Sequence, residues 1–144
     1  MKQTSFERRR FLHLGFAACA GMALWRPARA QAQGEVTAHV LDAMTGKPAA
    51  GVVVELYDLG GEKPLKVAQT ETNAQGRGDL IKDKPVPVGR YEMRFAIGDY
   101  FRKGSPPVAE PFFDVVPMRF FIAKPTESYH VPLIVTPYTY TVHG

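Results

Sequence analysis

The sequence has little cysteine and no long apolar stretch. Its 144 residues contain one cysteine, Cys19, which rules out a disulfide framework within the chain. The longest apolar run, residues 14–25, is too short to cross a bilayer core about 30 Å thick. Cys19 lies within the first 32 residues, which form a predicted export signal, so the domain that remains has neither disulfide nor thiol chemistry. We expect one domain that is stabilised by core packing and by subunit association.

The first 32 residues have the order of an export signal. A basic head containing Arg8-Arg9-Arg10 precedes the apolar run, and the small-x-small sites Ala28-Arg-Ala30 and Ala30-Gln-Ala32 follow it. The head resembles a twin-arginine signal. We expect cleavage after Ala30 or Ala32, which leaves a periplasmic domain over residues 33–144 that has no membrane anchor.

A basic excess is also absent once this signal is removed. The whole chain has 18 Lys and Arg against 14 Asp and Glu, a formal net charge of +4. Residues 1–32 hold six of the basic residues and one of the acidic ones, so the remaining chain has 12 against 13. A domain of net charge −1 gives no electrostatic reason to bind nucleic acid or an anionic membrane.

Short alternating runs and turn residues dominate the remaining chain, and no stretch has a competing helical period. About eight short strands, with turns every eight to twelve residues, predict an all-β sandwich with one short helical turn. In the clearest run, Tyr91, Met93 and Phe95 are expected to face inward, and the residues between them, Glu92 among them, outward. Strands are predicted at 36–42, 52–58, 66–72, 89–96, 115–123, 128–136 and 138–143, the helical turn near 99–101, and a turn at 72–76 that leads into Arg77.

Four polar residues within these elements are candidates for chemistry: His39, Arg77, His130 and His143. Taken singly, a strand histidine is most often a half-exposed surface residue, and an arginine after a turn is most often solvated. Three histidines could also supply nitrogen ligands to zinc, although no His-x-His pair is present. Residue types alone leave these readings open.

The sequence segments around these residues favour one of these interpretations. The chain resembles the transthyretin-related family of 5-hydroxyisourate hydrolases over essentially all of residues 33–144. This resemblance implies a transthyretin (prealbumin)-like β-sandwich, a homotetramer and an enzyme that needs neither metal nor other cofactor. The segments that carry it, in order and with compatible spacing, are Thr37-Ala-His-Val-Leu-Asp42, Gly46-Lys-Pro-Ala49, Thr72-Asn-Ala-Gln-Gly-Arg77, Phe112-Phe113, Tyr129-His-Val-Pro-Leu133 and Thr136-Pro-Tyr-Thr-Tyr140.

The same resemblance implies which residues act. The family's catalytic histidine, arginine and histidine fall on His39, Arg77 and His130, and transthyretin itself has lost these three. Two imidazoles suit proton transfer near neutral pH, and a guanidinium offers several donors in one plane to a ring with adjacent carbonyls. The implied reaction is hydrolytic ring opening of 5-hydroxyisourate, a cyclic amide formed in urate degradation.

The resemblance breaks down in the last residues. Family enzymes finish with tyrosine-arginine-glycine-serine, whereas this sequence reads Tyr140-Thr-Val-His-Gly144. We expect Arg77, Tyr140 and His143 to contact the substrate, with His143 as a substitute for a family residue. The alternative is a catalytically weakened, transthyretin-like periplasmic protein that binds a small ligand. An immunoglobulin-like structural module would explain Thr45-Gly-Lys-Pro-Ala-Ala-Gly-Val52 but not the motifs at Gly76-Arg77 and His130-Val-Pro-Leu133.

Overall fold

The structure is a computed structural model that describes residues 34–143. The predicted export signal lies outside these residues. The described part forms nine strands and one short helix, and every strand predicted from the sequence is present. The elements are β1 (Glu35–Asp42), β2 (Lys47–Pro48), β3 (Val53–Asp58), β4 (Leu65–Glu71), β5 (Arg77–Ile81), β6 (Gly89–Phe95), α1 (Ile97–Arg102), β7 (Val116–Ile122), β8 (Ser128–Val135) and β9 (Tyr140–Val142).

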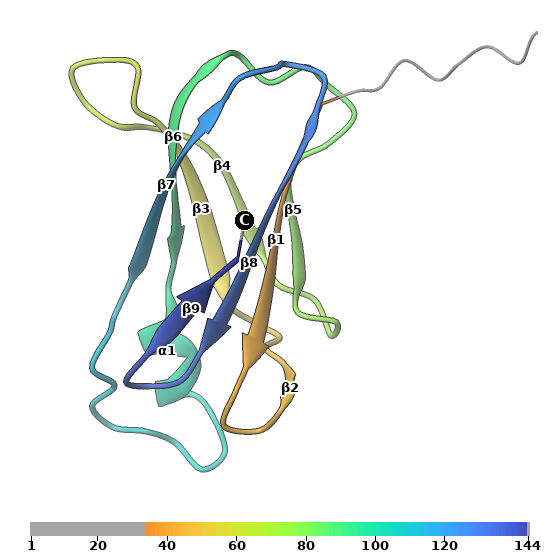
Figure 1. Cartoon of the computed structure of the whole chain (residues 1–144). Helices are drawn as coiled ribbons and strands as arrows, with labels where there is room; N and C mark the ends of the chain where they lie inside the picture. Colours follow the sequence, from red (N-terminus) through yellow and green to blue (C-terminus); the bar gives the residue numbers. More distant parts are fainter. Residues whose placement is uncertain (1–33, 144) are drawn as a thin grey trace, which may run out of the picture. The chain divides into compact units, whose positions relative to one another are not determined.

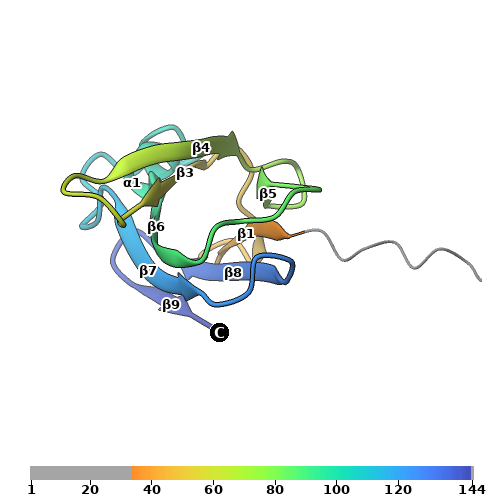
Figure 2. The same ribbon diagram turned by 90° about the horizontal axis from the view of Figure 1, so that it is seen from above.

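The strands form two sheets that face each other (Figure 1, Figure 2). One sheet has the order β2-β1-β8-β9, and β5 also pairs with β1; the other has the order β4-β3-β6-β7. All pairs are antiparallel except β1 with β8, which run parallel. The predicted all-β sandwich is therefore confirmed, and β1 lies between two neighbours that carry candidate site residues.

The alternation of β1 explains its place in the sandwich. Val36, Ala38 and Val40 have no exposed surface, while the residues between them remain partly exposed. Successive strand side chains point to opposite faces, so one face of β1 contributes to the core and the other carries Thr37 and His39. The face that carries the candidate residues is thus held in place by apolar packing on its reverse side.

Three elements differ from the sequence prediction. Strand β5 (Arg77–Ile81), which follows the predicted turn at 72–76, was not among the predicted strands. The segment around Lys47–Pro48, for which no strand was predicted, forms the two-residue strand β2 against the end of β1. The predicted helical turn is longer than expected, spanning Ile97–Arg102 as α1. This helix is six residues long, and none among residues 34–143 is long and apolar enough to span a bilayer. Strand β2 is too short to show an alternating pattern, and its pairing with β1 spans only the intervening turn.

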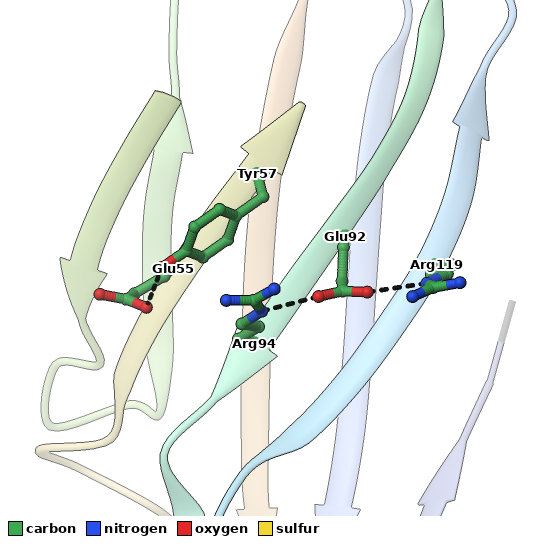
Figure 3. Close-up of polar contacts among 5 residues, drawn as sticks. All are labelled: Glu55, Tyr57, Glu92, Arg94 and Arg119. Atoms are coloured by element: carbon green, nitrogen blue, oxygen red, sulfur yellow. Dashed lines mark hydrogen bonds and ion pairs between the residues drawn. The ribbon is translucent and has the colours of Figure 1, made fainter. Parts of the chain in front are cut away.

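The burial of Glu92 was not predicted from the sequence. It lies on the outward face of β6 as predicted but is only 3% exposed. Its carboxylate accepts hydrogen bonds from Nε of Arg94 at 2.6 Å and from Nε of Arg119 at 2.7 Å (Figure 3). These two guanidinium groups lower the pKa of Glu92. Paired charges therefore cover the centre of this face.

Candidate active site

Three predicted site residues come together on the outer face of the sheet that contains β1. His39 of β1 is the register partner of Arg77 on β5, and Thr37 of β1 is the register partner of His130 on β8. Because directly paired strand residues point to the same face, His39, Arg77 and His130 share that face. The ring centroids of the two histidines are 6.1 Å apart, with 42° between the ring planes.

A tight turn delivers Arg77 to this position. The side-chain oxygen of Asn73 accepts hydrogen bonds from the backbone N–H groups of Gln75 at 2.9 Å and Arg77 at 3.0 Å. Gly76 has a φ of 71°, in the left-handed region, and a Cβ added there would overlap the carbonyl oxygen of Val40. Only glycine fits both conditions. The Gly-Arg pair of the motif thus has a geometric basis: the glycine permits the turn that sets the arginine beside His39.

The same turn fixes the proton on His39. Its Nε2 lies 3.1 Å from the backbone carbonyl oxygen of Gln75. A carbonyl oxygen can only accept a hydrogen bond, so Nε2 carries the proton. Nδ1 is then the nitrogen of His39 that remains for proton exchange with a bound molecule.

His130 has a different environment. Its Nδ1 lies 2.9 Å from the hydroxyl oxygen of Thr37. Desolvation against its neighbours lowers the pKa of His130, and the positive charges of Arg77 and His39 lower it further, while Glu35 opposes them. The imidazole of His130 is therefore neutral at neutral pH and able to accept a proton.

Asp42, the last residue of β1, stabilises the strand and is not part of the exposed face. Asp42 is 5% exposed and accepts hydrogen bonds from the backbone N–H of Met44 at 2.8 Å and from the hydroxyl of Tyr100 at 3.1 Å. Burial, with a smaller contribution from Asp42, raises the pKa of Tyr100 to about 12. Asp42 thus ties the end of β1 to α1.

The two remaining predicted residues lie apart from each other. His143 and His130 both line a hollow of about 250 Å³ that Val142 of β9 and Arg119 and Phe121 of β7 also border. Tyr140 lies at the opposite end of β9, paired with Val135, and its ring packs edge-on against Phe113 at 5.2 Å. The structure therefore places His143 near His130, and a substrate contact of Tyr140 stays a prediction.

Sequence reasoning did not single out the hydroxyl of Thr37 or the carbonyl of Gln75. Thr37 could have been found, because it is two residues before His39 and so shares its strand face. The Gln75 contact has no signal in residue type, since any residue there offers a carbonyl. Over residues 34–143, no three His, Cys, Asp or Glu side chains are grouped to hold a metal ion.

Comparison with known proteins agrees with this architecture. A model of the HIUase/Transthyretin family matches residues 36–144. The 5-hydroxyisourate hydrolase of Halalkalibacterium halodurans is 48% identical over 115 residues, which cover 76% of this chain and 96% of that protein. The solved structure of Klebsiella pneumoniae 5-hydroxyisourate hydrolase superposes with a TM-score of 0.64 at 30% identity, over 76% of this chain and 96% of the other.

Sea bream transthyretin in complex with thyroxine superposes with a TM-score of 0.68 over 75% of this chain and 92% of the other. At 24% identity, this likeness bears on the fold alone. The family model covers nearly all the described residues, and the bacterial hydrolases are similar along almost their whole length. The chain belongs to the HIUase/Transthyretin family.

Proposed function

We propose that this protein hydrolyses 5-hydroxyisourate, and that His39, Arg77 and His130 carry out the reaction. The observation that supports these roles most directly is the meeting of the three side chains on one outer sheet face, across the β1–β5 and β1–β8 pairings. The relatives named 5-hydroxyisourate hydrolase support the substrate. This cyclic amide opens when water adds to a ring carbonyl and the bond from that carbon to nitrogen breaks.

His130 acts as the general base. Its lowered pKa keeps the imidazole neutral, so it takes a proton from water as the oxygen attacks the ring carbonyl. The carbonyl oxygen becomes an oxyanion, and the guanidinium of Arg77 on the same face stabilises that charge. The lowered pKa leaves His130 unprotonated in the resting protein, with a lone pair available for this proton.

His39 supplies the proton for the departing nitrogen. Nε2–H remains bonded to the carbonyl of Gln75, so the proton leaves from Nδ1. Over one cycle, His130 gains one proton and His39 gives one up. When the tetrahedral intermediate collapses, the carbon–nitrogen bond breaks, the nitrogen gains a proton, and the former carbonyl carbon becomes a carboxylic acid. Exchange of protons with solvent restores both rings.

His143 contributes to substrate positioning. It borders the hollow that begins at His130, and this hollow, about 250 Å³ in volume, can hold part of a small heterocycle. An imidazole there can donate to or accept from the substrate's ring carbonyls and N–H groups. The expected result of His143→Ala is a higher KM with kcat little changed, since a contact made equally in ground and transition states affects binding alone.

The test is the ultraviolet decay of freshly generated 5-hydroxyisourate with and without the purified mature domain. The wild type should accelerate the decay, and the double variant His39→Ala/His130→Ala should not exceed the spontaneous rate. Full activity in that variant would remove both histidines from the mechanism. No acceleration by the wild type, together with saturable binding of a ring compound, would identify a carrier instead.

We further propose that the protein is exported to the periplasm by a twin-arginine-type signal and assembles as a homotetramer. The basic head and small-x-small sites support export. The three-residue edge strand β9, exposed along its length, offers free backbone groups for assembly. Cell fractionation of the full-length protein, compared with an Arg8→Lys/Arg9→Lys variant, tests export, and sedimentation of the mature domain tests assembly.

A further inference from the structure

Thr37 is the one residue within 34–143 whose side chain hydrogen-bonds to the ring of His130. Thr37 and His130 are register partners in the parallel β1–β8 ladder, and Oγ1 lies 2.9 Å from Nδ1. Nε2 of His130 makes no hydrogen bond to the described part of the chain. The contact joins one ring nitrogen to a hydroxyl and leaves the other nitrogen without a hydrogen bond within residues 34–143.

The direction of this hydrogen bond decides what His130 can do. A threonine hydroxyl can donate or accept, and a neutral imidazole has one donor and one acceptor nitrogen. If Thr37 donated to Nδ1, the proton of His130 would lie on Nε2 and neither nitrogen would have a free lone pair. If Thr37 accepts from Nδ1–H, Nε2 has the lone pair that a base needs.

The accepting arrangement also serves both protonation states of the ring. When His130 takes a proton on Nε2, Nδ1–H remains a donor, and the hydroxyl oxygen accepts from it without rotating. A hydrogen bond from the charged ring is stronger than one from the neutral ring, so the contact strengthens as the imidazolium forms. A donating hydroxyl would have to turn away at that moment.

We propose that Thr37 is a positioning residue that accepts Nδ1–H of His130 and thereby holds Nε2 as the proton-accepting atom. Thr37 acts on the substrate only through His130. It orients this base, just as a third residue orients the base of a catalytic nucleophile–base pair. The role of Nε2 as base rests on the proposed hydrolysis. The position of the proton in the resting protein can be measured without any substrate.

The competing explanation is structural. A β-branched residue suits a strand, and threonine at a partly exposed strand position requires no further reason. Valine has the same shape and a higher apolar content, so Thr37→Val would be neutral or stabilising on that account. Serine keeps the hydroxyl but loses the branch, so the two substitutions separate the hydrogen bond from strand packing.

The first experiment locates the proton by long-range nitrogen–proton NMR of the histidine rings in the substrate-free mature domain, at about pH 8, where His130 is neutral. The wild type and Thr37→Ser should show His130 protonated on Nδ1. Thr37→Val should shift it toward the Nε2–H form that unconstrained histidine favours, and His39 should stay protonated on Nε2 in all three. A wild-type His130 protonated on Nε2 would overturn the proposal.

The second experiment is kinetic. Thr37→Val should lower kcat roughly 10- to 100-fold, the effect of losing one hydrogen bond to a charged partner, with KM unchanged. Thr37→Ser should recover most of the rate even if its melting temperature is the lowest of the three. Equal kcat in wild type and Thr37→Val would overturn the positioning role.

The two experiments also separate this inference from the proposed function. If the wild type does not hydrolyse 5-hydroxyisourate, the NMR result still decides whether Thr37 sets the tautomer. If it hydrolyses the substrate while the tautomer is insensitive to Thr37→Val, the hydrolase assignment stands and the inference about Thr37 is wrong.

Discussion

His39 and Arg77 are register partners across the β1–β5 ladder, and the turn before Arg77 also supplies the carbonyl that holds Nε2–H of His39. One turn, residues 72–77, therefore positions the guanidinium and fixes the tautomer of the neighbouring imidazole. Changes to this turn should alter two functional groups at once.

Removal of the guanidinium should separate catalysis from folding. Arg77→Ala is expected to lower kcat/KM by roughly 100- to 1,000-fold, because the developing oxyanion loses a preorganised donor. Arg90→Ala is the matched control, since Arg90 is an arginine on the outer face of the opposite sheet. It should retain wild-type kinetics. Similar losses in both variants would show that surface charge in general, rather than this site, supports the rate.

The turn glycine can be tested against a glycine of the same conformation. Gly76→Ala and Gly46→Ala both place a side chain at positive φ, 71° and 68°, which costs about 1 kcal/mol. A Cβ at Gly46 meets open space, whereas one at Gly76 overlaps the Val40 carbonyl. Chemical denaturation should show Gly76→Ala to be less stable than Gly46→Ala by about 1–3 kcal/mol.

Catalysis should follow the same order as stability in this pair. Displacing the Val40 contact moves the Gln75 carbonyl and Arg77 together, so Gly76→Ala should lose activity under conditions where it remains folded. Gly46→Ala should not. Equal stability and equal activity of the two variants would contradict the close approach of the turn to β1.

The pH dependence of activity follows from the lowered pKa of His130. The base must be neutral, so kcat/KM should fall on acidification only as the pH passes through this pKa, below the ordinary value of 6.5. Of the charged groups that face the ring, Arg77 and His39 lower its pKa and Glu35 raises it. Arg119 and His143 border the same hollow. An acid limb above 6.5 would contradict the environment described for His130.

NMR titration of His130 separates these contributions even in inactive variants. Arg77→Gln should raise the pKa of His130, since a positive charge that opposes ring protonation is removed. Glu35→Gln should lower it, since a negative charge that favours protonation is removed. Shifts of the same sign in both variants would mean that desolvation, rather than these charges, controls the ring.

The buried carboxylate of the opposite sheet predicts a pH-dependent contribution to stability. The pKa of Glu92 is lowered by its hydrogen bonds to Arg119 and Arg94, so its stabilising effect is present above the unfolded-state value of 4.5 and lost as the pH falls through the folded-state value. Glu92→Gln should reduce the free energy of unfolding at pH 7 by about 1–3 kcal/mol. This difference should shrink at acidic pH.

Glu62→Gln is a suitable comparison, because Glu62 is an exposed acid in the loop between β3 and β4. It should leave both the stability at pH 7 and the acid dependence unchanged. A constant difference between Glu92→Gln and wild type from neutral to acidic pH would show that the carboxylate is not charged in the fold.

The sequence predicted the strands closely because alternation is a local property. The predicted run 128–136 is Ser128–Val135 in the structure, and 89–96 is Gly89–Phe95. The burial of Glu92 could not be predicted in this way. Its burial depends on Arg119, which is 27 residues away and adjacent only because β6 pairs with β7.

The candidate site shows the same division. The sequence motifs identified His39, Arg77 and His130. The tautomers of the two histidine rings depend on contacts with Gln75 and Thr37. These contacts exist only once β1, β5 and β8 have paired. Tyr140 and His143 were both predicted to contact the substrate. The strand separates them, because an extended chain places residues three apart about 10 Å from each other.

The parallel pairing of β1 with β8 sets the order in which the molecule can be completed. Thr37 and His130 are 93 positions apart in the chain, whereas β3, β4, β6 and β7 join by antiparallel pairs between nearer segments. Closing so long a loop is slow, and one side of β1 stays an open edge until β8 reaches it. During synthesis, a chain that ends before β8 contains all strands of the opposite sheet. It lacks His130 and the strand that pairs with the open edge of β1. The open edge of β1 therefore needs protection from aggregation until residues 128–144 have been synthesised.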